Sequence, residues 1–212
     1  MVESTYDVSE DGVQSERRVA RITQIIGSYR LLALLLALPW AWLAVGHAAG
    51  WLFYGEVVHA SGEWAMRFLL AALAVTPLRR IFPHYAWTAW LLRRRRYLGV
   101  AAFAYTVLHA AVYLQRIADL PRILAEAAEV GLLTGWIGLA LFLPLAITSN
   151  DASVRRLGPT WKTLHRLIYA AAAASFAHWI LVAFDRTTAY AYLAIWVALT
   201  VVRFAVSRAQ TY

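Results

Sequence analysis

Long apolar blocks, separated by short charged segments, constrain this 212-residue chain more than any other feature of its sequence. A helix crosses the roughly 30 Å hydrocarbon core of a bilayer with about 20 apolar residues. Hydrophobic residues make up 61% of the chain and charged residues only 15%, which excludes most soluble enzymes and disordered chains. The blocks that we interpret as membrane-spanning helices cover residues 31–49, 64–78, 97–114, 130–149, 164–184 and 189–202.

Basic residues alternate between rich and poor segments along the chain. Of the 20 Lys and Arg residues, 16 lie before the first block, around the second-to-third and fourth-to-fifth connections, or after the last block. Cytoplasmic segments of membrane proteins carry this excess of positive charge. The pattern therefore predicts that both termini are cytoplasmic, and it explains the net charge of +8 without a nucleic-acid partner.

We therefore predict an all-α membrane protein. A bundle of six transmembrane helices would cover residues 31–206, with cytoplasmic tails at 1–30 and 207–212. A cleaved signal peptide is the alternative for the first block, but its leading region would be unusually long and acidic, so a retained helix is favoured. The chain has no cysteine, which excludes disulfides, thiolate metal sites and iron–sulfur ligands.

Two histidines are expected at similar depth on two different helices. His109 lies 12 residues after Tyr97, about 18 Å into the third helix, and His178 lies 14 residues after Leu164, about 21 Å into the fifth. Two neutral imidazoles at one level can ligate one haem iron from both faces, an arrangement that suits electron transfer. The alternative is that each ring donates to a backbone carbonyl and only stabilises packing. The absence of a carboxylate deep in any span favours a metal over proton transport.

A third histidine, His165, is expected near the cytoplasmic end of the fifth helix. It could ligate a second, inner haem, although 13 residues of ideal helix would turn its ring roughly 140° from that of His178. The third helix offers Arg95 and Arg96, rather than a histidine, at that level. The alternative is an interfacial histidine that binds phosphate, lipid or flavin.

Arg67 lies one turn inside the second helix, near its outer end. It could hold a haem propionate through a charge-assisted pair. Snorkelling to the outer headgroups or pairing with Glu63 is an equally good interpretation. On the inner side, basic residues form a collar that sets topology and contacts anionic lipid, and that could also hold a flavin phosphate or an acidic donor protein. The residues of this collar are Arg79, Arg80, Arg155, Arg156, Lys162 and Arg166.

Four sequence motifs resemble a known family. They are GEWAMRFLLAALAVTPLRR (62–80), RRYLGVAAFAYTVLHAAVYL (95–114), LPLAITSN (143–150) and RRLGPTWKTLHRLIYAAAAASFAH (155–178). In this order they resemble the MsrQ or YedZ family, the haem-binding membrane subunits of periplasmic protein-methionine-sulfoxide reductase systems. The resemblance covers roughly residues 25–205. That family belongs to the wider ferric-reductase-like transmembrane family.

The resemblance implies a multi-pass protein of the bacterial inner membrane that holds one or two haems b, through histidines matching His109, His165 and His178, together with FMN. Electrons would come from the quinone pool or a cytoplasmic flavin reductase. They would pass to a periplasmic molybdopterin-containing catalytic subunit, so this chain would be an electron-transfer subunit rather than the catalyst of methionine sulfoxide reduction. Larger members of the wider family carry a cytoplasmic FAD/NADPH domain, whereas no G-x-G-x-x-G motif occurs in this sequence.

Two other functions remain open at this stage. A ferric or quinone oxidoreductase with another acceptor would have similar helices, and an adjacent gene for an exported molybdoenzyme would argue against it. A non-redox membrane protein with packed histidines is the third hypothesis, and it predicts that the protein expressed with ample haem binds none.

Overall fold

The computed structural model describes residues 29–209, with side chains described as far as residue 205. Most of the expected N-terminal tail, and the end of the C-terminal tail, lie outside these residues. The described part of the chain is helical and contains no strand. Its longer helices are α2 (Tyr29–Ala48), α3 (Tyr54–Ile81), α4 (Ala86–Ile117), α6 (Val130–Ile147), α9 (Ile168–Val182) and α10 (Thr187–Ala209).

Short helical elements occupy two connections between the long helices. The α6–α9 connection holds α7 (Asp151–Leu157), α8 (Pro159–Leu164) and a 3₁₀ turn, η1 (His165–Leu167), whereas the α4–α6 connection holds α5 (Leu120–Ala127). The Asn150 side chain accepts a hydrogen bond from the Ser153 amide at 2.8 Å and so caps α7. Gly158, at φ 51°, turns the chain between α7 and α8, a conformation that costs glycine little.

Four of the described helices are long and apolar enough to cross a membrane, namely α2, α4, α6 and α10. The other two long helices depart from that pattern for local reasons. Helix α3 carries Glu63 and Arg67 within its apolar half. Helix α9 has 15 residues because the chain turns at η1, so the continuous helix predicted over 164–184 is wrong at its first residues. The chain is thus a multi-pass membrane protein, and the count of six spans stays a prediction.

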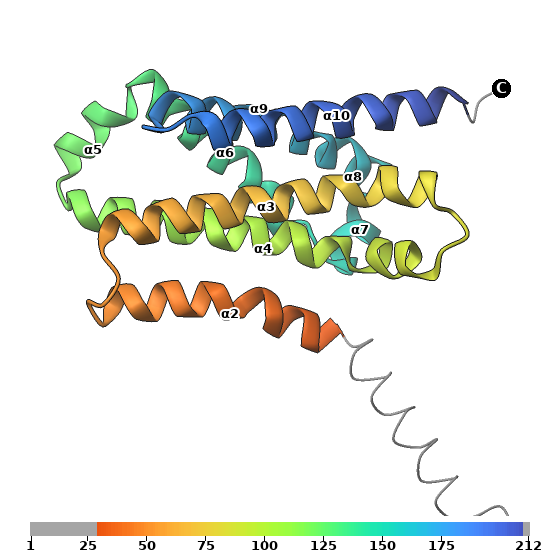
Figure 1. Cartoon of the computed structure of the whole chain (residues 1–212), viewed down its shortest axis with the longest axis horizontal. Helices are drawn as coiled ribbons and strands as arrows, with labels where there is room; N and C mark the ends of the chain where they lie inside the picture. The colour runs from red at the N-terminus through yellow and green to blue at the C-terminus, as the bar shows by residue number, and fades with distance from the viewer. Residues whose placement is uncertain (1–28, 210–212) are drawn as a thin grey trace, which may run out of the picture.

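The long helices lie side by side along one axis, with α5 at one end of the bundle and α7 and α8 toward the other (Figure 1). Helix α3 packs along α4, and α6 packs along α9, so the bundle contains two close pairs. Helix α10 covers α3, and α2 lies against α4 on the opposite side. We call the end near α5 the α5 end and the end near α7 and α8 the α8 end.

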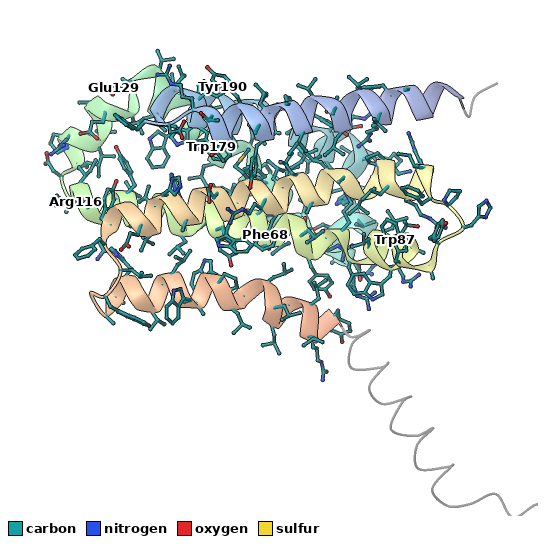
Figure 2. The ribbon with its side chains drawn as sticks, in the orientation of Figure 1. Phe68, Trp87, Arg116, Glu129, Trp179 and Tyr190 are labelled. Carbon is teal, nitrogen blue, oxygen red and sulfur yellow. The ribbon has the colours of Figure 1, made fainter. Side chains whose placement is uncertain are left out.

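An apolar core separates the two ends of the bundle. Its centre includes Leu69 and Leu73 of α3, Phe142 of α6 and Phe176 of α9, all at most 5% exposed. Figure 2 shows the side chains that fill the spaces between the ribbons, with Trp179 toward the α5 end and Trp87 toward the opposite end. Within the described residues, one cavity lies on each side of this core.

Candidate functional site

His109 of α4 and His178 of α9 face each other across a cavity of about 750 Å³ near the α5 end. Their ring centres are 6.0 Å apart and their planes are nearly perpendicular, at 87°. With metal–nitrogen bonds of about 2 Å, two imidazoles on opposite sides of one metal have centres roughly 6 Å apart. The structure therefore brings together the two rings that the depth arithmetic pairs, at a separation that suits a shared metal. We call this cavity the histidine pocket.

Each ring of the pair is fixed by a bond to a backbone carbonyl. Nδ1 of His109 lies 2.9 Å from the Val58 carbonyl oxygen, and Nδ1 of His178 lies 2.8 Å from that of Gly131. Because a carbonyl only accepts, each Nδ1 carries the proton and donates it. Nε2 of both neutral rings then keeps its lone pair for a metal, which is the usual arrangement of a ligating histidine. The hydrogen bond to a backbone carbonyl that is expected of a structural histidine is thus present in both rings. The same bond leaves Nε2 of each ring unprotonated and able to bind a metal.

Two glycines leave room for the rings. A Cβ atom at Gly62 of α3 would lie 3.3 Å from Nδ1 of His109, and one at Gly135 of α6 would lie 2.7 Å from Nδ1 of His178. Most of the remaining wall is apolar, and no Lys or Arg lines the pocket among the described residues. The donor set and the cradle thus fit a flat, largely apolar group with a metal at its centre. Sequence reasoning missed both glycines, although each follows a hydroxyl residue and precedes a tryptophan by one or two positions.

Arg67 is engaged by protein groups at the rim of the histidine pocket. Its guanidinium donates to the Glu63 carboxylate at 2.7 Å and to the Tyr192 hydroxyl at 3.0 Å. Glu63, rather than Arg67, lines the cavity. The pairing with Glu63 that the sequence offered as one interpretation is therefore present, and the contact of Arg67 with a haem propionate stays a prediction.

His165 lies apart from the histidine pair, in the η1 turn at the α8 end. Its Nε2 is 3.0 Å from Thr148 Oγ1, and its ring stacks on Trp161 with centres 3.9 Å apart. It lines a second cavity of about 740 Å³, together with Arg95 and Arg96. The structure thus places His165 beside the two arginines that the sequence put at its level, and in a different cavity from His178.

Positive charge dominates this second cavity, which we call the basic pocket. Arg95 bridges α4 to α3 by donating to the Ala72 carbonyl at 2.9 Å and to Thr76 Oγ1 at 3.2 Å. The Tyr169 hydroxyl is buried without a hydrogen-bond partner, and the Arg203 guanidinium lies over the Tyr169 ring at 5.2 Å. An unpaired buried hydroxyl is unusual and is consistent with a ligand that completes it. The cations that line the pocket are Arg93, Arg95, Arg96, Lys162, Arg166 and Arg203.

Comparison with known protein families matches this chain to one of them. The model of the ferric reductase-like transmembrane component matches residues 61–176, more than half of the chain. The chain belongs to this family. The matched region includes His109 and His165 and ends two residues before His178.

Similar proteins confirm the resemblance found in the sequence. A protein of Rhizobium meliloti (strain 1021), named protein-methionine-sulfoxide reductase heme-binding subunit MsrQ, is 46% identical over 126 residues, which is 58% of this chain and 56% of that protein. A protein of the same name from Brucella ovis is 41% identical over 126 residues, 58% of this chain and 55% of its own length. The chain thus spans about half the length of these relatives. No solved structure matches it.

Proposed function

We propose that the chain is a haem b subunit that carries electrons across the bacterial inner membrane to a protein-methionine-sulfoxide reductase. The observation that carries this proposal is the facing pair His109 and His178, with ring centres 6.0 Å apart and each Nδ1 on a carbonyl. A haem bound there supplies reversible one-electron chemistry. The names of the similar MsrQ proteins support haem as the group and methionine sulfoxide reduction as the process.

The chain's own residues make the histidine pocket suitable for electron transfer. His109 and His178 would both hold the metal of a bound haem, and two histidine ligands would leave no site open for oxygen or substrate. The carbonyls of Val58 and Gly131 hold the Nδ1 protons and keep both rings in one orientation. The largely apolar wall of the pocket would favour a hydrophobic group such as haem. This chain would therefore pass electrons on, and the reduction of methionine sulfoxide would belong to a separate periplasmic, molybdopterin-containing catalytic subunit.

The basic pocket is the proposed site of FMN. Its cations would pair with the phosphate, and the indole of Trp161 would stack against the ring system. The positive-inside pattern supports a cytoplasmic location for this pocket, where the quinone pool or a flavin reductase would supply electrons. A second haem on His165 is the alternative occupant, and Thr148 would then have to release the Nε2 of that ring.

The proposed topology has six spans with both termini in the cytoplasm. Helices α3 and α9 would join the four more apolar helices as spans, since each packs along one of those helices for most of its length. The α5 end would then face the periplasm, with the histidine pocket nearer that side. The catalytic partner would dock on the connections at this end.

Reduced-minus-oxidised spectra and haem content of the purified protein test the proposal. We expect His109→Ala and His178→Ala each to lose the low-spin b-type signal of the histidine pocket. His84→Ala, an exposed histidine in the connection between α3 and α4, is the matched control and should keep the signal. A full signal in both of the first two variants would show that this pair does not hold the haem.

A further inference from the structure

The helices that face the histidine pair share a short pattern. Residues 58–62 of α3 face His109, and residues 131–135 of α6 face His178. In each segment the first residue supplies a carbonyl to the imidazole, the fourth residue carries a hydroxyl, and the fifth is glycine. Four residues make about one helical turn, so the carbonyl and the glycine lie on the same face of the helix. We call each segment a notch.

In the α3 notch, two side chains converge on one oxygen. The Val58 carbonyl accepts from Ser61 Oγ at 3.1 Å and from Nδ1 of His109 at 2.9 Å. Gly62 stands beside the ring, where a Cβ would lie 3.3 Å from Nδ1 and 3.4 Å from Cε1. Ser61 is fully buried, so its hydroxyl has no access to water and stays on this carbonyl.

The α6 notch repeats the arrangement with tighter distances. The Gly131 carbonyl accepts from Thr134 Oγ1 at 2.7 Å and from Nδ1 of His178 at 2.8 Å. A Cβ at Gly135 would lie 3.0 Å from Cε1 of the ring and only 2.7 Å from Nδ1, and the second distance is closer than real Cβ contacts allow. An alanine at this position would therefore displace the ring of His178, or the helix that carries it.

We propose that Gly62 and Gly135 are positioning residues that admit the two imidazoles to the carbonyls, and that Ser61 and Thr134 tune the resulting bonds. A carbonyl oxygen has two lone pairs. In a helix the carbonyl oxygen already accepts a hydrogen bond from a backbone amide. The hydroxyl and the imidazole therefore compete for its remaining lone pair. The strength of the Nδ1–H bond sets the basicity of Nε2, so the hydroxyls would moderate ligand strength. The ligand role rests on the proposed function, whereas the orientation of the rings does not.

Alanine substitutions test the glycines in a graded series. We expect Gly135→Ala to weaken haem binding about 10–100-fold, the range for groups that orient metal ligands, and to alter the low-spin electron paramagnetic resonance signal. Gly62→Ala should have a smaller effect of the same kind. Gly138→Ala is the matched control on α6, because its Cβ would press on Ser175 Oγ at 3.1 Å and not on His178. Gly99→Ala, where a Cβ meets nothing within 4 Å, is the control for α4.

A measurement without haem separates this inference from the proposed function. Nitrogen-15 chemical shifts of the haem-free protein in nanodiscs should show both rings protonated at Nδ1, and Gly135→Ala should change His178 alone. Should Gly135→Ala fail to fold, Ser61→Ala and Thr134→Val replace it, and each should shift the haem midpoint potential to more negative values. Unchanged tautomers and haem affinity in Gly135→Ala, or unchanged potentials in both hydroxyl variants, would overturn the inference. If the His109 and His178 variants showed that this pair does not hold haem, the nitrogen-15 measurement of Nδ1 protonation would still test how the glycines position the rings.

Discussion

The two cavities of this bundle have almost the same volume, about 750 and 740 Å³, but opposite chemistry. The histidine pocket presents a facing imidazole pair, and its charged lining residues are the carboxylates of Glu63 and Asp185. The basic pocket presents one histidine, six cations and the carboxylate of Asp151. One cavity is thus suited to coordinating a metal, and the other to neutralising an anion.

The difference follows from where each pocket lies along the bundle. In the proposed topology, the α8 end carries the positive charge that would orient the chain in the membrane. Cations that contribute to the positive-inside pattern also line the basic pocket there. An anionic ligand could therefore bind to them without further charged residues being buried. The α5 end is poor in Lys and Arg, and apart from the carboxylates of Glu63 and Asp185 its pocket presents neutral groups: imidazoles, carbonyls and glycines. The comparison indicates that the distribution of Lys and Arg between the two ends favours an anionic ligand at the α8 end and a metal-containing group at the α5 end.

Among the tests of this comparison between the two pockets, the largest effect is expected from removing a cation that faces the basic pocket. If the basic pocket holds FMN as proposed, Arg203→Gln should weaken its binding about 10-fold or more, because a hydrogen bond to a charged group contributes about 1.5–3 kcal/mol. The haem signal of the histidine pocket should not change. Arg155→Gln, an exposed cation that does not line the pocket, is the control. Flavin fluorescence and haem spectra of the same sample measure both outcomes, and equal loss of flavin in the two variants would contradict a separate anion site.

A smaller effect is expected on stability, from Arg95 in the basic pocket. Arg95→Met removes the bonds to Ala72 and Thr76 that join α4 to α3, and should lower the free energy of unfolding by about 1–3 kcal/mol. Arg96→Met is the matched control. Its pair with Asp151 is solvent-exposed, at 39% and 75% of the two side chains, and such pairs contribute about 0–1 kcal/mol. Thermal unfolding in detergent should separate the variants, and equal melting temperatures would mean that the bridge has no structural role.

The sequence predicted one pocket better than the other, for a geometric reason. Helical rise is nearly constant, so the depth of His109 along α4, and that of His178 along a helix assumed to begin near Leu164, could be computed without any contact information. The turn η1 changes the rise over three residues only, so the two depths still match closely. The rotational position of His165 could not be computed in this way, because η1 interrupts the helix that the calculation assumed to be continuous. The bond from Arg67 to Tyr192 joins residues 125 positions apart, and no local pattern encodes it.

Other features were missed because their signals are short. Helix α5 has eight residues, too few to stand out from the connection that contains it. The notches each depend on a hydroxyl followed by glycine, at Ser61–Gly62 and Thr134–Gly135, a pair of residues that is common in any sequence. The hydroxyl–glycine pair becomes informative only when a histidine packs against it. That histidine comes from another helix, through the packing of α3 on α4 and of α6 on α9.

The smallest expected effect is a response to acid that is confined to the α5 end. The Glu126 carboxylate accepts from Arg122 Nε at 2.6 Å and from the Tyr113 hydroxyl at 2.9 Å, and these two bonds, the first above all, lower the pKa of Glu126. A carboxylate whose pKa is lowered by folding stabilises the folded state above its ordinary pKa, and this contribution is lost as the pH falls through the lowered pKa.

Acidification below the ordinary Glu value of about 4.3 should therefore loosen α5 from α4 while the guanidinium groups of the basic pocket keep their charge. Amide hydrogen exchange should show faster exchange in α5 and a smaller change in α8. Arg122→Ala should move the onset to higher pH, because the pKa of Glu126 then rises toward its ordinary value. Equal acceleration of exchange at both ends would mean that acid acts on the whole bundle. The proposed contrast between the α5 end, which responds through the Glu126 carboxylate, and the α8 end, which carries permanently charged guanidinium groups, would then be wrong.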